Sequence, residues 1–177
     1  MPQASVLARH RGKSRIRDFG PCPVPAPSGR VREMEFDSGG LEILDQQECS
    51  ALLLAAPLGR IVFTQHALPA IQPVNFALDG ADIIIRTASG SRLSAATANS
   101  VVAFEIDDFD RDRRCGWSVV IIGQARRVSD PDEIASLSCL ALQPWVPEGR
   151  DQYIRIRPEI VTGRRLSYDR AASAEIR

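Results

Sequence analysis

The sequence predicts a mainly β protein, a Greek-key-like antiparallel barrel of six or seven strands with about three short helices. Apolar and β-branched runs of strand length recur along the chain, and hairpin-length connections join most of them, which favours antiparallel pairing. The chain shows neither a strand–helix alternation nor a glycine-rich phosphate motif of the kind that marks parallel α/β sheets. A small antiparallel sheet of this kind closes most simply into a barrel.

The composition is that of an ordinary soluble globular protein, with 44% apolar and 25% charged residues. No run of 18 apolar residues is present, so a membrane-spanning helix is not expected. The 22 basic and 22 acidic residues balance, which gives the whole chain no electrostatic preference for nucleic acid. The four cysteines lack metal-site spacing and no apolar leader precedes them, which predicts reduced thiols in a cytoplasmic protein.

The first 35 residues differ in composition from the rest of the chain. They hold seven basic and three acidic residues and a proline-rich run at 21–27 that cannot form a helix or an inner strand. We expect residues 1–35 to be a disordered tail, residues 36–170 to form the domain, and residues 171–177 to be a second tail. A nucleic-acid arm or a transit peptide are the alternatives for the first segment, and Met34 is an alternative start.

The first half of the domain is predicted to be a helix followed by three strands. A capping box opens the helix, because Asp45 and Glu48 stand three residues apart before an apolar run, and Pro57 and Gly59 end it. Strands are expected at 59–65, 69–78 and 81–87, with Asp79-Gly80 as a hairpin turn before the third. A proline at position 73 places the second strand at an edge or a bulge.

The second half continues with a short helix of small residues at 91–98 and strands at 101–106 and 117–128. A charged loop is expected between those strands, over residues 107–116. The next helix begins at Asp130, with Pro131 at its first position and Glu133 at N3. Two more strands, at 153–156 and 160–166, complete the domain.

The end of the third strand carries the most informative polar residues, which are Arg86, Thr87, Ser91 and Arg92. Ser91 is a plausible N-cap, so backbone N–H groups would be free at this turn, and arginine offers a planar donor fork suited to phosphate. The pattern indicates an anion site for a phosphorylated cofactor, and an ordinary polar loop with solvated arginines is the alternative reading.

Two further places carry candidate ligand contacts. Asn75 lies in an otherwise apolar strand and needs hydrogen-bond partners, which could be neighbouring backbone or the polar edge of a bound ring. Trp117 and Ser118 enter the long fifth strand, where the indole could stack near an aromatic ligand or belong to the core.

Six short stretches, taken in order over about residues 42–166, resemble the pyridoxamine 5′-phosphate oxidase-like superfamily of flavin-binding split barrels, and most closely its small flavin-binding branch. The stretches are Pro57-Leu58-Gly59-Arg60-Ile61, the run from Pro73 to Gly80, the run from Ile85 to Leu93, Val102 to Asp107, Gly116-Trp117-Ser118-Val119 and Ile156 to Arg165. Each is weak by itself, and their common order makes the resemblance specific.

The resemblance implies a homodimer with two FMN sites at the subunit interface. By position, Asn75 would face the isoalloxazine ring, and Arg86 and Thr87 would hold the ribityl phosphate region. Ser91 and Arg92 would bind the phosphate, and Trp117 and Ser118 would line the ring pocket. The anion site inferred from the residues and the phosphate site implied by the resemblance coincide.

The resemblance also implies a function, an FMN-dependent oxidoreductase acting on a small molecule. The substrate-gripping histidine segment of true pyridoxamine phosphate oxidases is not matched, because residues 153–158 contain no histidine. The deazaflavin coenzyme is an alternative cofactor. A protein that holds flavin or haem without turnover is the alternative class, with His66 as the one histidine of the domain that could ligate haem.

Overall fold

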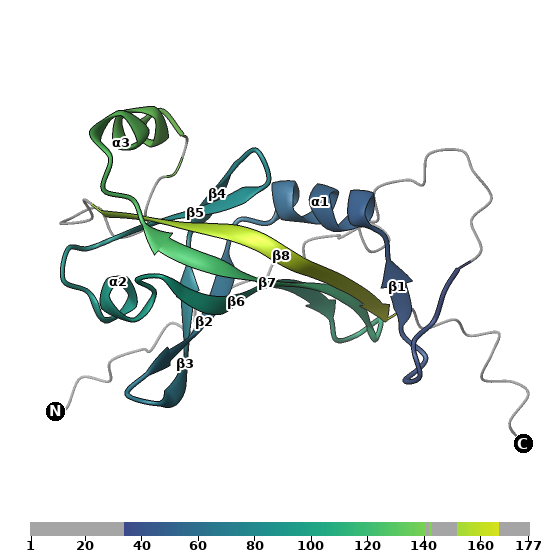
Figure 1. Ribbon diagram of the computed structural model, residues 1–177. Coiled ribbons are helices and arrows are strands. Elements are labelled where there is room, and N and C mark those ends of the chain that lie inside the picture. Colours follow the sequence, from purple (N-terminus) through teal and green to yellow (C-terminus); the bar gives the residue numbers. More distant parts are fainter. Residues whose placement is uncertain (1–33, 141, 143–151, 167–177) are drawn as a thin grey trace, which may run out of the picture.

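The computed structural model describes residues 34–140, 142 and 152–166, which form one curved antiparallel sheet with three short helices around it (Figure 1). The strands are β1 (Glu42–Leu44), β2 (Gly59–Gln65), β3 (Leu68–Val74), β4 (Phe76–Asp79), β5 (Asp82–Thr87), β6 (Ser100–Asp110), β7 (Cys115–Arg127) and β8 (Gln152–Leu166). The helices are α1 (Gln46–Ala55), α2 (Arg92–Ala96) and α3 (Pro131–Ser138). The predicted class, mainly β with peripheral helices, is confirmed.

The strand order explains why the sheet curls into a split barrel. The hydrogen-bonded strands follow the order β3-β2-β6-β7-β8-β5-β4 across the sheet, and β1 pairs with the C-terminal end of β8. β3 and β4 stand at opposite ends of this order, yet only Asn75 separates them in the chain. The two ends of the sheet must therefore approach each other, although no ladder joins β3 to β4 among the described strands.

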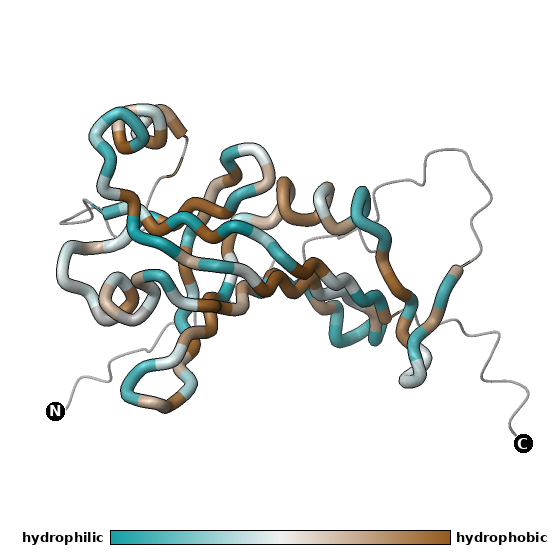
Figure 2. The backbone as a smooth tube through the Cα atoms, in the orientation of Figure 1, coloured by the Kyte–Doolittle hydropathy of each residue, from teal (hydrophilic) through white to brown (hydrophobic). Residues whose placement is uncertain are grey.

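Two apolar clusters lie on opposite faces of the sheet. The larger cluster fills the barrel and includes Ile61, Phe104, Ile121 and Ile154, all fully buried. The smaller cluster lies under α3, where Leu137 packs on the other face of β5 and β8. Figure 2 shows brown, apolar segments along the central strands and hydrophilic colour at the turn between β6 and β7.

The predicted helix caps are present. Asp45 accepts a hydrogen bond from the Glu48 backbone N–H at 2.8 Å, and the Glu48 carboxylate accepts one from the Asp45 N–H at 3.3 Å. Asp130 caps α3 with the first of these two bonds, accepting from the Glu133 N–H at 2.9 Å. These local bonds satisfy N–H groups that a helix start leaves without partners, which is why the sequence could place both helices.

Several strand boundaries differ from the sequence prediction. The expected strand at 69–78 is broken at Asn75 into β3 and β4. The charged loop expected at 107–116 is mostly strand, because β6 and β7 stay paired out to Asp110 and Cys115. The short strand β1 was not predicted.

The last two predicted strands are one continuous strand, β8. It passes through Pro158, which lies at a bulge where the register against β7 shifts between Ile122 and Gly123. The register skips Glu159, directly after the proline, and a proline is tolerated beside such a bulge because the hydrogen-bond ladder is interrupted there.

Most of the described chain falls within the predicted domain, while the predicted tails lie almost entirely outside the described residues. In the described part of the chain, no helix is long and apolar enough to span a membrane.

Candidate functional site

A cluster of hydroxyl groups lies where β5 ends and α2 begins. The Thr87 and Ser91 hydroxyl oxygens are 2.9 Å apart, and the Ser91 oxygen accepts a bond from the Ser94 N–H at 3.1 Å. Gly90, with a φ of +68°, lets the chain reverse between them, in a region that few side chains adopt. The predicted N-cap role of Ser91 is confirmed.

Gln152, at the start of β8, completes this cluster. Its amide nitrogen donates to the Ser89 hydroxyl at 3.1 Å, and its carbonyl oxygen accepts from the Ser94 hydroxyl. Gln152 is also the direct pairing partner of Thr87. Sequence reasoning missed this residue, because only the register of β5 against β8 brings a glutamine 65 positions away to the loop.

Arg86 and Thr87 point to opposite faces of β5, because successive strand residues alternate. Thr87 is buried on the barrel side. The Arg86 guanidinium lies 5.7 Å from the ring centre of Tyr153, on the side that α3 covers. The structure therefore brings Thr87 together with Ser91 but leaves Arg86 on the other face. The side chain of Arg92 lies outside the described part, although its backbone opens α2.

A cleft of about 510 Å³ borders the hydroxyl cluster, with Gly90 and Ser94 belonging to both. The remaining lining residues come from α2, the turn between α2 and β6, and the end of β7 with the loop after it, and they are Ala95, Ala98, Asn99, Arg126, Arg127 and Ser129. This volume is in the range of small-molecule sites.

The charges around this end of the sheet are organised by Arg155 and Glu133. Arg155 donates to Asp79, Asp82 and Glu133 at 2.7–2.8 Å, and Arg126 donates to Glu133 at 2.6 Å. The bond from Arg126 holds the pKa of Glu133 below its ordinary value, opposed by partial burial and aided by Arg155. Partial burial disfavours the charged form of Arg155, but its bonds to the three carboxylates outweigh this and raise its pKa.

The other predicted contacts lie elsewhere. Asn75 is half-buried at the junction of β3 and β4, beside Phe76, whose ring meets the Phe104 ring edge-on at 5.0 Å. Trp117 is 9% exposed and belongs to the barrel core. Ser118 points to the outer face, where it is paired with Asp107 and Arg164.

The two halves of the predicted site are far apart in one chain. Trp117 and Arg127 stand at opposite ends of β7, ten steps apart, which is roughly 33 Å of strand. Figure 1 shows α2 and the turn between β6 and β7 at opposite ends of the sheet. The hydroxyl cluster and the Trp117 region therefore lie at different ends of one subunit.

An apolar row crosses the outer face of the sheet. Register places Ile71, Val62, Ala103, Ile122 and Ile160 side by side on five strands. Ile71 is 68% exposed and Ile160 53% exposed. Isolated exposed apolar residues are common, but a contiguous row of this kind is typical of a protein–protein contact.

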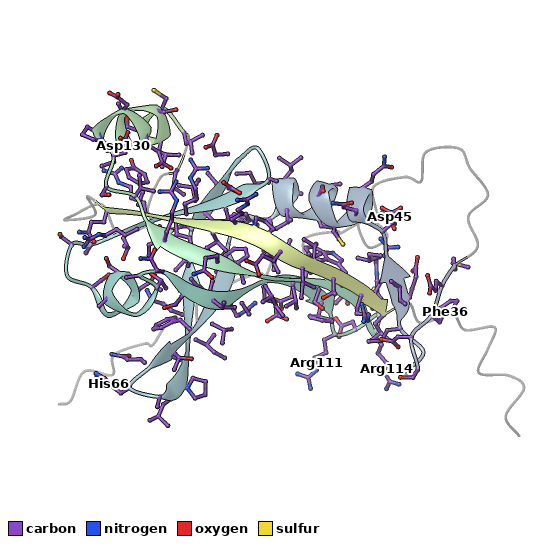
Figure 3. All side chains as sticks on the ribbon, viewed as in Figure 1. Phe36, Asp45, His66, Arg111, Arg114 and Asp130 are labelled. Carbon is purple, nitrogen blue, oxygen red and sulfur yellow. The ribbon has the colours of Figure 1, made fainter. Side chains whose placement is uncertain are left out.

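His66 lies at the exposed tip of the hairpin between β2 and β3, with a φ of 49° (Figure 3). It does not line the cleft beside α2. The geometry therefore offers the haem hypothesis no enclosed position for an axial ligand at this residue.

Comparison with known proteins identifies relatives over most of the domain. The family model for pyridoxamine 5′-phosphate oxidase matches residues 45–165. The uncharacterised protein Rv0080 of Mycobacterium tuberculosis is 46% identical over 131 residues, covering 71% of this chain and 86% of that protein.

Two solved structures are similar over nearly their whole length. The FAD binding protein from Mycobacterium smegmatis is 38% identical, with a TM-score of 0.64, and the match covers 72% of this chain and 99% of that one. A candidate pyridoxamine 5′-phosphate oxidase from Corynebacterium glutamicum is 39% identical, with a TM-score of 0.65 and coverage of 73% and 95%.

Proposed function

Since the chain belongs to the pyridoxamine 5′-phosphate oxidase family, we propose that it binds a flavin nucleotide at sites shared between two copies of itself. The observation that carries the proposal is the separation within one subunit. A phosphate-sized group of donors lies at one end of the sheet and the Trp117 region at the other, roughly 33 Å of strand away. A second subunit laid across the first would bring the two ends together twice, once at each site.

The donors at the end of β5 fit the phosphate of such a cofactor. Thr87 and Ser91 supply hydroxyl groups, and Gly90 leaves the loop open because it has no side chain. Arg92 would add the charge, as the fork of an arginine pairs well with phosphate oxygens. Arg86 would join them only if its guanidinium leaves Tyr153.

The ring would lie between the subunits, with Asn75 at its polar edge and Ser118 of the second copy along the pocket. Trp117 of that copy, which lies in the barrel core, would support the same strand from the inner face. A bound flavin supplies the redox chemistry, and the chain's own residues bind it, orient it and exclude water. The activity we propose is that of an oxidoreductase taking electrons from a small-molecule reductant.

The outer apolar row is the surface we assign to the second copy. It lies on β2, β3, β6, β7 and β8, so it extends along the strands that separate the two half-sites. A dimer formed here would bury the exposed side chains of Ile122 and Ile160. We expect a buried area above about 2,000 Å² in total, as in obligate pairs.

The cofactor candidates are FMN, FAD and the deazaflavin coenzyme, since all three carry a tricyclic ring, a ribityl chain and a phosphate. FMN is the form that the sequence resemblance implies, and FAD is the form named for the M. smegmatis protein.

The test is the absorbance of the purified protein and its anaerobic reduction by NADH or NADPH. Paired bands in the blue and near-ultraviolet, bleached by one of the reductants, are expected for a flavin oxidoreductase. A single violet band would identify the deazaflavin instead. A flavin spectrum that neither reductant bleaches would favour a binding protein, and failure to bind any flavin would refute the proposal.

A further inference from the structure

Gln152 holds two serine hydroxyls in opposite hydrogen-bonding states. Its amide nitrogen donates to the Ser89 hydroxyl at 3.1 Å, so the Ser89 oxygen is the acceptor in this bond. Its carbonyl oxygen accepts from the Ser94 hydroxyl, whose one hydrogen is used there. Only an amide can do both, because it carries donors on one atom and acceptors on the other, whereas a carboxylate only accepts.

The Ser89 hydrogen remains for another acceptor. A serine hydroxyl can donate one hydrogen while it accepts another. Ser89 is exposed and accepts from Gln152, and it donates to no residue that the structure describes. Ser94 differs, because it is buried and its hydrogen is bound to Gln152. Gln152 therefore separates one buried hydroxyl, which ties down α2, from one exposed hydroxyl that can donate to a ligand.

The pair of Thr87 and Ser91 also keeps one hydrogen for a ligand. Two hydroxyls carry two hydrogens, and the 2.9 Å contact between their oxygens uses one of them. The Ser91 oxygen accepts a further bond from the Ser94 N–H at 3.1 Å. The pair and Ser89 together thus offer two hydroxyl donors on one short loop. Two donors without a carboxylate among the bonded members of the cluster suit an anion such as phosphate.

The sheet holds Gln152 in place for this role. It is the direct ladder partner of Thr87, and the start of β8 lies at the same end of the sheet as α2 (Figure 1). Its half-buried side chain bonds both the loop before α2, through Ser89, and the helix itself, through Ser94. Donors that are oriented before a ligand arrives lose little freedom on binding, which is the advantage of preorganisation.

We propose that Gln152 is a positioning residue of the phosphate site, and that the Ser89 hydroxyl it orients is a further phosphate donor. The inference rests on the proposed flavin site at Thr87 and Ser91. Gln152 acts through Ser89 and Ser94 and does not itself bind the ligand. A site that presents donors selects a group that only accepts hydrogen bonds. FMN should gain affinity from it, whereas riboflavin, which has a hydroxyl in place of the phosphate, should not.

The substitution Gln152→Glu tests the direction of the bonds with almost no change in shape. A carboxylate accepts from both serines, so it takes the Ser89 hydrogen away from the ligand and places a negative charge near the phosphate. FMN binding at pH 7.5, measured by fluorescence titration, should weaken at least about tenfold, and riboflavin binding should stay within about twofold.

A pH series distinguishes orientation from a purely structural role. A protonated glutamic acid has one donor and one acceptor, as the amide does, so Gln152→Glu should recover most of its FMN affinity relative to wild type as the pH falls from about 7.5 to about 4.5. Comparing the two proteins at each pH cancels the protonation of the FMN phosphate, near about pH 6. The charged groups lining the adjoining cleft in the described chain are Arg126 and Arg127, which stay protonated throughout.

A second variant removes the proposed donor itself. Ser89→Ala changes an exposed residue and should weaken FMN binding about three- to tenfold, with riboflavin within about twofold. Combined with Gln152→Glu it should cost less than the product of the separate losses, because Gln152 acts through Ser89. Gln47→Glu makes the same chemical change at an exposed residue of α1 and is the matched control, which should alter neither ligand.

The outcomes separate this inference from the proposed function. Unchanged FMN affinity in Gln152→Glu, or losses that multiply fully in the double variant, would overturn the role of Gln152 and leave the flavin site intact. Equal losses for FMN and riboflavin, or no recovery at low pH, would show a purely structural residue and would also overturn it. If circular dichroism shows that Gln152→Glu does not fold, an unchanged FMN affinity in Ser89→Ala would overturn the inference instead. Wild type that binds no flavin, or binds FMN no more tightly than riboflavin, would refute the proposed phosphate site itself.

Discussion

At the scale of single residues, Arg155 connects the strands to α3. Its side chain is 15% exposed and its guanidinium reaches three carboxylates, Asp79 and Asp82 at the hairpin of β4 and β5, and Glu133 on α3. Arg155 therefore helps to hold the helix on the outer face of the sheet, together with the Arg126–Glu133 pair and the packing of Leu137. Replacing it leaves three carboxylates close together with one cation fewer.

The first prediction concerns this cluster and pH. The folded pKa of Glu133 lies below its ordinary value, so its stabilising contribution is present above about pH 4.5 and is lost as the pH falls through the folded pKa. Glu133→Gln should lower the melting temperature at pH 7, and the difference from wild type should shrink as the pH falls through the folded pKa of Glu133, because the protonated side chain is then as neutral as glutamine. A difference in melting temperature that stays constant as the pH falls would contradict this role of the Glu133 charge.

The substitution Arg155→Met should lower the free energy of unfolding by about 2 kcal/mol at pH 7.

The second prediction concerns the proposed phosphate contact of Arg92. Arg92→Ala should weaken FMN binding by about 1.5–3 kcal/mol, the range for hydrogen bonds to charged groups. Riboflavin lacks the phosphate, so it should bind wild type more weakly and be nearly indifferent to the substitution. Fluorescence titration with both ligands measures this, and equal losses for the two would argue against a phosphate contact.

At the scale of elements, β8 organises the sheet. One of its edges pairs with β7 over nearly the whole strand, and the other is shared between β5 and β1. The bulge at Pro158 lets one strand of fifteen residues serve all three neighbours. Gly123 lies opposite this bulge, where an added Cβ would stand 2.1 Å from the Arg157 carbonyl oxygen.

The third prediction follows from that contact. Gly123→Ala should destabilise the protein by about 1–3 kcal/mol, because backbone rather than a flexible side chain must move to make room. Urea unfolding measures the loss. Gly80→Ala is a useful comparison, because nothing lies within 4 Å of its added Cβ and only its φ of +63° opposes the substitution. A smaller loss at Gly123 than at Gly80 would contradict the steric argument.

At the scale of the whole molecule, the proposed site depends on assembly. One subunit places the hydroxyl cluster and the Trp117 region at opposite ends of the sheet, so the same apolar row that would hold the dimer would also complete the proposed flavin site. Dimerisation and cofactor binding should therefore fail together.

The fourth prediction tests this coupling. Ile122→Arg puts a charge in the middle of the outer apolar row and should yield a folded monomer with greatly reduced flavin affinity. Light scattering, circular dichroism and flavin titration measure the three properties. Leu54→Arg, at a residue 75% exposed on α1, is the matched control and should change none of them. A monomer that keeps full flavin affinity would show that one subunit suffices.

The fifth prediction concerns the segment before Met34. A chain comprising residues 34–177 should keep the flavin affinity, the dimer and the melting temperature of the full chain within a few degrees, because the first segment has little apolar periodicity to contribute to a core. Loss of flavin affinity on truncation would mean that the basic segment contributes to the site. Loss of a salt-dependent affinity for DNA would support the nucleic-acid alternative.

The sequence by itself determined the features that depend on near neighbours in the chain. Asp45 and Asp130 cap their helices through residues three positions away, and Asp79-Gly80 makes its turn from local backbone preferences. The β-branched runs identified most strands for the same reason. The order of motifs also predicted the family, because motif order is a property of the chain and needs no register.

Only the tertiary structure decided what depends on register and alternation. Gln152 meets Ser89 and Ser94 because β8 pairs with β5, and Arg86 turns away from Thr87 because adjacent strand residues face opposite sides. Pairing between β6 and β7 extends both strands through charged residues that the sequence predicted to be a loop. The separation of the Trp117 region from Thr87, on which the proposal of a second subunit rests, follows from the length and direction of β7, since motif order along the chain carries no information about distance across the sheet.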